Sequence, residues 1–173
     1  MLAPAKKPAE ALQAMGAPRE LIEWVRKMKP EEAVRQAWID VTRADWMPYL
    51  AVLRGISKDA VVRAACECAR ELAEPLASTP QGARIVAILR EHALATAEQQ
   101  LEDLRLAMLA HGDANQPAWM FWCRLVLELA RAGRRGNPLI GVSLALRMLT
   151  VSGGRRGSSD LVARFRDALV LAG

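Results

Sequence analysis

The sequence has little of what the common catalytic and metal sites require. It contains three cysteines and two histidines. It has no Walker-type phosphate loop, no dinucleotide-binding fingerprint and no HExxH zinc motif. Neighbouring acids such as Glu31-Glu32 and Glu102-Asp103 lie on polar faces of expected helices, where we interpret them as solvated charge and not as an acid–base pair. We therefore predict that the protein is not an enzyme and holds no cofactor and no metal.

The cysteines are too few and too scattered for a disulfide framework. Cys66, Cys68 and Cys123 are odd in number and lie on apolar helix faces, which predicts a reducing compartment, the cytoplasm. Residues two apart on a helix point about 200° apart, so Cys66 and Cys68 are poorly placed to bind one ion. We therefore expect all three cysteines to be small buried side chains of the core. The alternative is a Cys–His nucleophile, because the sequence spacing does not exclude that His92 or His111 approaches a thiol in the folded chain.

No apolar run is long enough to cross a membrane. The most apolar segment, Pro117 to Ala130, is shorter than the roughly 20 residues that a membrane-spanning helix needs, and it carries Arg124 and Glu128. No apolar stretch follows the first charged residues, so no signal peptide is expected. The sequence therefore predicts a protein that does not insert into membranes.

Glycine and proline are also few, and they separate segments with helical periodicity. Hydrophobic residues make up 52% of the chain and charged residues 25%, which predicts a folded core. No alternating pattern is backed by hairpin turns. We predict one all-α domain over residues 1–173, an irregular bundle of about eight to ten helices, with residues 1–7 as a loose leader. The alternative is a short α-solenoid-like array of helical hairpins, although no signature residues repeat.

The stretch from Ser57 to Leu76 is the expected central helix, with Ser57 as its N-cap and Pro75 closing or bending it. Its polar residues fall on one line with spacings of four, three and four, and a helix with one narrow polar stripe has neighbours on most sides. The stripe consists of Arg63, Glu67, Arg70 and Glu74. The side chains expected to be largely buried are Val62, Ala65, Cys66, Ala69, Leu72 and Ala73.

Start and stop signals place the other helices around this one. Pro30 is expected at the first position of a helix, Asp45 as the cap of the next, and Thr79-Pro80 as another start. The C-terminal third is expected to hold three helices. These run from Pro117 to Ala132, from Asn137-Pro138 to about Val151, and onward from Ser158 or Ser159.

Positive charge is concentrated in the C-terminal third. Residues 1–114 have a balance of −1 and residues 115–173 a balance of +6, from nine arginines, no lysine and three acids, which together give the net +5. Two loops each place a double arginine and glycines just before a helix, an arrangement suited to carboxylates or phosphates. These partner-binding candidates are Arg131, Arg134, Arg135, Arg155 and Arg156. We predict an acidic protein partner; the alternative is a solvated face. No aromatics are interleaved with the arginines, which argues against nucleic acid.

The tryptophans are expected to anchor the core, and one pair of them is also a candidate for an interface. Trp38, Trp46, Trp119 and Trp122 have the spacing of core positions. Trp119 and Trp122 are three residues apart and share a helix face, whereas Phe121 projects differently. A helix with aromatics on more than one side is deeply buried or contributes to an interface. Trp119 and Trp122 are therefore a second candidate for the partner-binding site.

Several short motifs together resemble a known family. They are Ala44-Asp-Trp-Met-Pro-Tyr-Leu50, Ala64-Ala-Cys-Glu-Cys-Ala-Arg70, Gln116-Pro-Ala-Trp119 with Phe121-Trp122, and Arg164-Phe-Arg-Asp-Ala-Leu169. In combination they are similar to a family of small, uncharacterised, all-helical bacterial proteins encoded near type VI secretion genes. The Asp-Trp and Ala-Cys-x-Cys-Ala part also resembles predicted bacterial immunity proteins.

Neither resemblance supplies catalytic residues. The resemblance to the secretion-linked family implies a non-enzymatic protein–protein interaction module, an accessory or adaptor of a bacterial secretion or contact-dependent system. The resemblance to immunity proteins implies the alternative, a protein that neutralises a toxin by occlusion. The partner would accordingly be a secretion-system component or a toxin.

The substitution Cys66→Ser tests the central position of the Ser57–Leu76 helix. It places a hydroxyl in an apolar environment and should lower the free energy of unfolding by roughly 1–3 kcal/mol. Urea unfolding measures the change. A stability equal to that of the unmodified chain would mean that this helix is not central.

Overall fold

All regular structure in the described residues is helical, which confirms the all-α prediction. The computed structural model describes residues 7–90, 99, 102–103, 106, 121–129, 137–152 and 157–172. These residues form eight α-helices, two 3-10 helices and a helical segment at residues 121–129. The α-helices are α1 (Pro8–Ala14), α2 (Arg19–Arg26), α3 (Ala33–Asp40), α4 (Met47–Leu53), α5 (Lys58–Ala73), α6 (Pro80–Arg90), α9 (Pro138–Ser152) and α10 (Gly157–Ala172). The 3-10 helices are η1 (Ala44–Trp46) and η2 (Glu74–Ser78).

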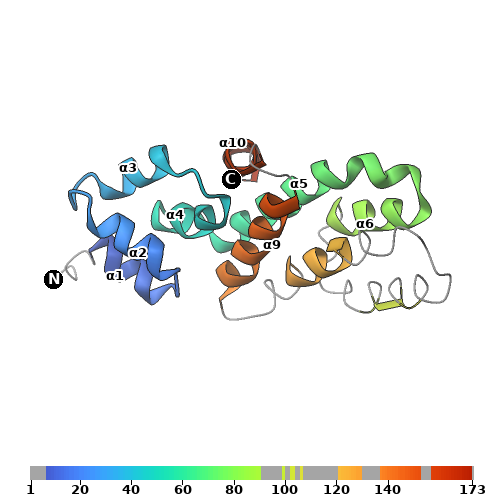
Figure 1. Ribbon diagram of the computed structural model, residues 1–173, viewed down its shortest axis with the longest axis horizontal. Helices are drawn as coiled ribbons and strands as arrows, with labels where there is room; N and C mark the ends of the chain where they lie inside the picture. Colours follow the sequence, from blue (N-terminus) through green and yellow to red (C-terminus); the bar gives the residue numbers. More distant parts are fainter. Residues whose placement is uncertain are drawn as a thin grey trace.

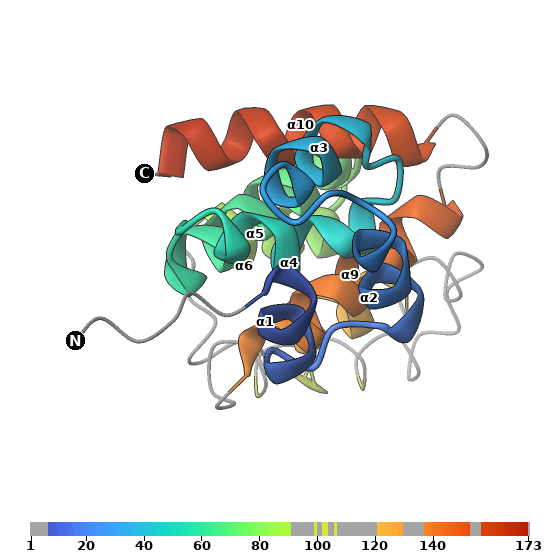
Figure 2. The same cartoon turned by 90° about the vertical axis from the view of Figure 1, so that its left-hand side faces the viewer.

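The helices form a bundle in which elements far apart in sequence pack together. Figure 1 shows α1 to α4 at one end, α6 at the other, α9 and α10 near the middle, and α5 running from the middle toward the end with α6. Helix α10 is seen end-on in Figure 1 and at full length in Figure 2, where it lies across the top of the molecule. It packs on α5, and α9 packs on α5, α4 and η1. In a solenoid each repeat contacts only its neighbours, so these contacts favour the irregular bundle over the helical array.

Helix α5 starts and ends where its sequence predicts. The Ser57 hydroxyl accepts a hydrogen bond from the backbone N–H of Ala60 at 3.2 Å, which satisfies one of the free donors of the first turn. After Ala73 the chain tightens into η2, which contains Pro75. A proline cannot donate the next backbone hydrogen bond of an α-helix, so the α-helical pattern stops there.

The burial of α5 agrees with the prediction at four of six positions. Ala65, Cys66, Ala69 and Ala73 are at most 1% exposed, whereas Val62 is half-buried and Leu72 is 37% exposed. The prediction was therefore wrong for Leu72 and overstated for Val62. Both residues lie toward the ends of α5. The side that is covered at Val61 and Cys68 is open one turn later at Leu72, because the end of α5 extends beyond the elements that cover that side.

The predicted polar stripe of α5 is half-buried to exposed, and its arginines all donate hydrogen bonds. Arg70 donates to Glu67, with Nε 3.0 Å from Oε2, and to Glu74, with Nη1 3.3 Å from Oε2. Arg63 donates from Nη2 to the backbone carbonyl of Ala172 at 2.6 Å, which ties the stripe to the end of α10. Exposed ion pairs of this kind each contribute about 0–1 kcal/mol, so the stripe orients α5 more than it stabilises it.

Two expected helix starts are wrong. Helix α3 begins at Ala33 and not at Pro30, because residues 30–32 form turns. Asp45 does not cap α4, whose N-cap is Trp46 without a side-chain bond. Asp45 is instead buried in η1, where Arg43 donates to its carboxylate from Nε at 3.1 Å and from Nη2 at 2.7 Å. This hydrogen bond raises the pKa of the Arg43 guanidinium, and it gives the nearly buried carboxylate the partner that it needs.

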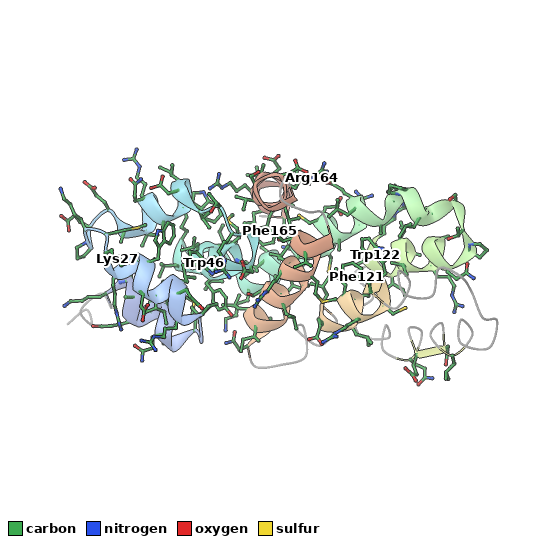
Figure 3. The ribbon with its side chains drawn as sticks, viewed as in Figure 1. Lys27, Trp46, Phe121, Trp122, Arg164 and Phe165 are labelled. Carbon is green, nitrogen blue, oxygen red and sulfur yellow. The ribbon has the colours of Figure 1, made fainter. Side chains whose placement is uncertain are left out.

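One continuous apolar core extends from α1 to α10. Phe165 of α10 is fully buried, and Figure 3 shows its side chain pointing from α10 toward α9. Ile85 and Leu89 of α6 belong to the same core, as do Leu125 and Leu129 of segment 121–129. The core therefore connects the C-terminal helices to both ends of the bundle.

Truncating Phe165 should be among the most damaging single changes. Phe165→Ala removes a fully buried ring and should lower the free energy of unfolding by about 3–5 kcal/mol. Val170→Ala on the same helix is the control, because Val170 is 81% exposed and its truncation should change stability by less than about 0.5 kcal/mol. Urea unfolding followed by circular dichroism compares the two. Equal effects would contradict the placement of α10.

Candidate interaction surface

Most of the predicted partner-binding residues lie outside the described part of the chain. This holds for Arg131, Arg134, Arg135, Arg155, Arg156 and Trp119. Trp122 is described and half-buried. Its ring lies edge-on to Phe121, with centroids 5.6 Å apart and planes at 86°, and both side chains pack against the core (Figure 3). Trp122 therefore has a clear packing role, and only part of its surface is free for a partner.

A row of exposed side chains runs along the outer face of α9. Ile140 is 53% exposed, Leu144 37% and Val151 77%, and the exposed Arg147 lies between the last two. Their spacings are four, three and four residues, so all four side chains fall within an arc of about 60° on the helix. We call Ile140, Leu144, Arg147 and Val151 the α9 seam. Isolated exposed hydrophobic residues are common, but three aligned on one helix form an unusual apolar surface.

The opposite face of α9 is part of the core, which explains why the sequence did not reveal the seam. Leu139, Val142 and Leu146 are fully buried. Since α9 is apolar on nearly all sides, its periodicity does not show which apolar residues face outward. The available signal was the absence of a polar face on this helix. A helix without one is buried or contributes to an interface.

Hydrogen bonds to distant segments hold α9 in place. Asn137 caps its start, with Oδ1 accepting from the N–H of Leu139 at 3.3 Å and Nδ2 donating to the carbonyl of Met15 at 2.7 Å. The buried Ser143 hydroxyl donates to the carbonyl of Asp45 at 2.7 Å. The seam therefore lies on a helix that is fixed to the N-terminal half of the bundle. Because the backbone of α9 is already ordered, a partner can bind the seam without first rearranging that helix.

Arg147 is an exposed positive charge without a carboxylate on its own helix. Helix α9 contains no acidic residue, and Arg147 forms no ion pair with the described residues. Arg164 of α10 shows the contrast, because it donates to Glu71 at 3.1 Å and to Asp160 at 2.9 Å. These two hydrogen bonds raise the pKa of Arg164. Arg147 is thus a cation that can pair with a group from outside the described chain.

Trp38 and Trp46 have the anchoring role expected of them. Trp46 lies 5.3 Å from Trp24, centroid to centroid, and the Arg43 guanidinium lies 4.5 Å above the Trp46 ring. Trp38 has Arg54 at 4.7 Å and Arg166 at 5.5 Å from its ring centroid. Such cation–π contacts join α3, α4 and α10 through side chains that are already engaged. We therefore do not count these rings as free binding surface.

The described residues include an open hollow at the end of α10 and no metal-binding cluster. The hollow, of about 310 Å³, is open and lies between α5 and the end of α10, lined by Arg63, Glu67, Ala168, Leu171 and Ala172. Within the described ranges, no three His, Cys, Asp or Glu side chains are grouped so that they could hold a metal ion. Across the same residues, no helix is long and apolar enough to cross a membrane.

The cysteines are buried side chains of the core. Cys66, Cys68 and Cys123 form no disulfide and are at most 3% exposed. Burial raises the pKa of the Cys66 and Cys68 thiols from 9.0 to about 12, so both stay protonated near neutral pH. A protonated, enclosed thiol is a poor nucleophile and a poor metal ligand. His92 and His111, the possible partners of a thiol nucleophile, lie outside the described residues.

Comparison with known proteins gives the chain no relatives: no family model, no curated protein and no solved structure matches it.

The raised thiol pKa values predict a loss of stability at alkaline pH. In the unfolded chain the thiols ionise near pH 9, but in the folded protein they stay protonated up to about 12. Their contribution to stability is therefore complete below about pH 9. As the pH rises toward 12 it is lost, by up to about 1.4 kcal/mol per pH unit for each thiol. Urea unfolding between pH 8 and about 11 measures this slope.

The double variant Cys66→Ala with Cys68→Ala is the control for the alkaline slope. Because it has no thiol at either position, its stability should fall less steeply above pH 9 than that of the unmodified chain. Identical slopes would contradict the burial of the two thiols.

Proposed function

We propose that the protein is a non-enzymatic protein-binding module, an accessory or adaptor of a bacterial secretion or contact-dependent system, and that its partner binds along α9. The α9 seam is the observation that carries this proposal. It combines exposed apolar side chains with a helix that is fixed to the rest of the bundle. Covering such a surface removes apolar area from water at little ordering cost, which is the usual source of affinity in protein interfaces.

The charge distribution favours an acidic partner. The region 115–173 contains nine arginines and three acids. In sequence, Arg134 and Arg135 come just before α9, and Arg155 and Arg156 come just after it. The exposed Arg147 lies between the two pairs. A partner along α9 would thus meet an apolar row that is flanked in sequence by arginines, which favours negative charge on that partner.

The seam is a better primary candidate than the tryptophan pair. Trp122 is half-buried and engaged with Phe121 and the core, whereas the seam residues face outward. Trp119 and Trp122 remain the second candidate for the partner-binding site. Hot-spot residues of interfaces are often aromatic or arginine, so a contribution from Trp119 and from the arginine pairs agrees with the composition of known interfaces.

The assignment to a secretion or contact-dependent system rests on the sequence resemblance. Its motifs include Ala44–Leu50 and Ala64–Arg70. The three buried cysteines form no disulfide, which suits the reducing bacterial cytoplasm that we propose as the location. Secretion sheath and spike genes next to the coding gene would support this assignment.

The second candidate is an immunity protein that blocks a toxin by occlusion. Its support is the Asp-Trp and Ala-Cys-Glu-Cys-Ala resemblance. Cys66 and Cys68 of that motif are buried in α5, so the motif would maintain the fold and would not contact the toxin. The toxin would then have to bind the outer surface, with α9 again the best candidate. A toxin gene immediately upstream would favour this alternative.

Charge reversal before α9 tests the proposed function. The variant Arg134→Glu with Arg135→Glu should weaken binding of the partner recovered from the native host and make the remaining binding less sensitive to salt, because fewer charge pairs contribute. Calorimetry at two salt concentrations measures both effects. Circular dichroism should show an unchanged fold.

The matched control reverses two exposed charges at the end of α2, Arg26→Glu with Lys27→Glu, and should leave affinity nearly unchanged. Indifference of affinity to the Arg134/Arg135 reversal and to salt would mean that these arginines are solvated charge. In that case apolar contacts would have to account for binding, either at the α9 seam or at Trp119 and Trp122.

A further inference from the structure

We infer that the partner binds as an acidic amphipathic helix lying along the α9 seam, with a carboxylate against Arg147. This inference rests on the proposed function and adds the shape and chemistry of the partner. Three observations carry it: the spacing of Ile140, Leu144, Arg147 and Val151, the exposed cation within this apolar row, and the lack of any acidic residue on α9.

The spacing of the seam matches a second helix. Steps of four, three and four residues are those of the a and d positions in a coiled coil, where side chains of one helix insert between those of another. The seam covers 12 residues from Ile140 to Val151, whose 11 steps of 1.5 Å span about 16 Å along the axis, and its side chains are about 4.5 to 6 Å apart along it. Alternate residues of an extended strand are about 6.7 Å apart and would lose register over this distance. The geometry therefore favours a helix over a strand.

Arg147 determines the charge of that helix. It occupies one of the four seam positions, so a helix packed on the seam removes water from its guanidinium. A desolvated cation without a carboxylate is strongly unfavourable, whereas a paired one gives direction and specificity. Because α9 has no acidic residue and no described residue forms an ion pair with Arg147, we expect the partner to supply the carboxylate.

The same reasoning disfavours a second copy of the chain as the occupant. If two seams paired antiparallel, Arg147 of each copy would lie near Leu144 of the other, and a parallel pairing would place Arg147 against Arg147. Neither arrangement brings a carboxylate from α9 to the guanidinium. A complementary acidic helix meets both requirements of the seam, apolar contact and charge neutralisation.

Site-specific crosslinking identifies what covers the seam. The photoreactive residue p-benzoylphenylalanine replaces Leu144 in the full chain, is irradiated in the native host, and the crosslinked segment is sequenced by mass spectrometry. Leu72 on α5 is the matched control, because it is also 37% exposed. We expect crosslinks from position 144 and not from position 72, to a segment with net negative charge and apolar residues at spacings of three and four.

Binding of that segment, made as a synthetic peptide, is then measured with Arg147 variants. Arg147→Glu should reduce affinity at least about tenfold, and Arg147→Lys should reduce it less. The control Arg84→Glu changes an arginine on α6 that is also exposed, and it should have little effect. Replacing the facing peptide carboxylate by lysine should restore binding to the Arg147→Glu variant.

The other outcomes overturn the inference in distinguishable ways. Crosslinks from position 144 to a second copy, to lipid, or to a segment without net negative charge contradict the acidic helix. A partner that crosslinks only through other surfaces also contradicts it but leaves the proposed binding function standing. Absence of any protein crosslink from position 144, from position 151 and from the control position contradicts both.

Discussion

Close packing around α5 is the constraint on which the rest of the structure depends. Its buried positions are mostly alanine and cysteine, with Ala60, Ala64, Ala65, Ala69 and Ala73 at most 3% exposed. The distance between packed helices depends on the side chains at their contact, so small residues allow neighbours to approach closely. Helices α6, α9 and α10 all pack on α5. A bulkier residue on this helix would displace several neighbours at once, because a close-packed core relaxes only in part.

The position of α9 follows from this packing. One face contributes Leu139, Val142 and Leu146 to the core, and polar bonds from Asn137 and Ser143 fix the helix to the N-terminal half. The opposite face is exposed and carries Ile140, Leu144, Arg147 and Val151. Structure and proposed function are therefore linked through one element, since the contacts that bury one side of α9 also hold the other side ready for a partner.

Features that depend on local sequence signals, such as helix ends and the polar face of α5, could be predicted from the sequence. Features that depend on where neighbouring helices lie and end, such as the exposure of single side chains, could not. The Ser57 cap, the stop before Pro75 and the polar stripe of α5 were predictable, because each is determined within a few residues. The exposure of Leu72 depends on where the neighbours of α5 end, which periodicity does not contain. Asp45 had the sequence of a cap, yet its carboxylate pairs with Arg43 in η1. The α9 seam was hidden because the helix is apolar on nearly all sides, whereas the arginines around it were visible as charge.

Native-state hydrogen exchange tests the central position of α5 most directly. Amides that exchange only when the whole protein unfolds have an opening free energy equal to the free energy of unfolding from urea denaturation. We predict this equality for the interior amides of α5, from Val62 to Ala69, with lower opening free energies in α1 and α3 at the end of the bundle. If the amides of α5 open at a lower free energy than those of α1 or α3, the bundle is not organised around α5.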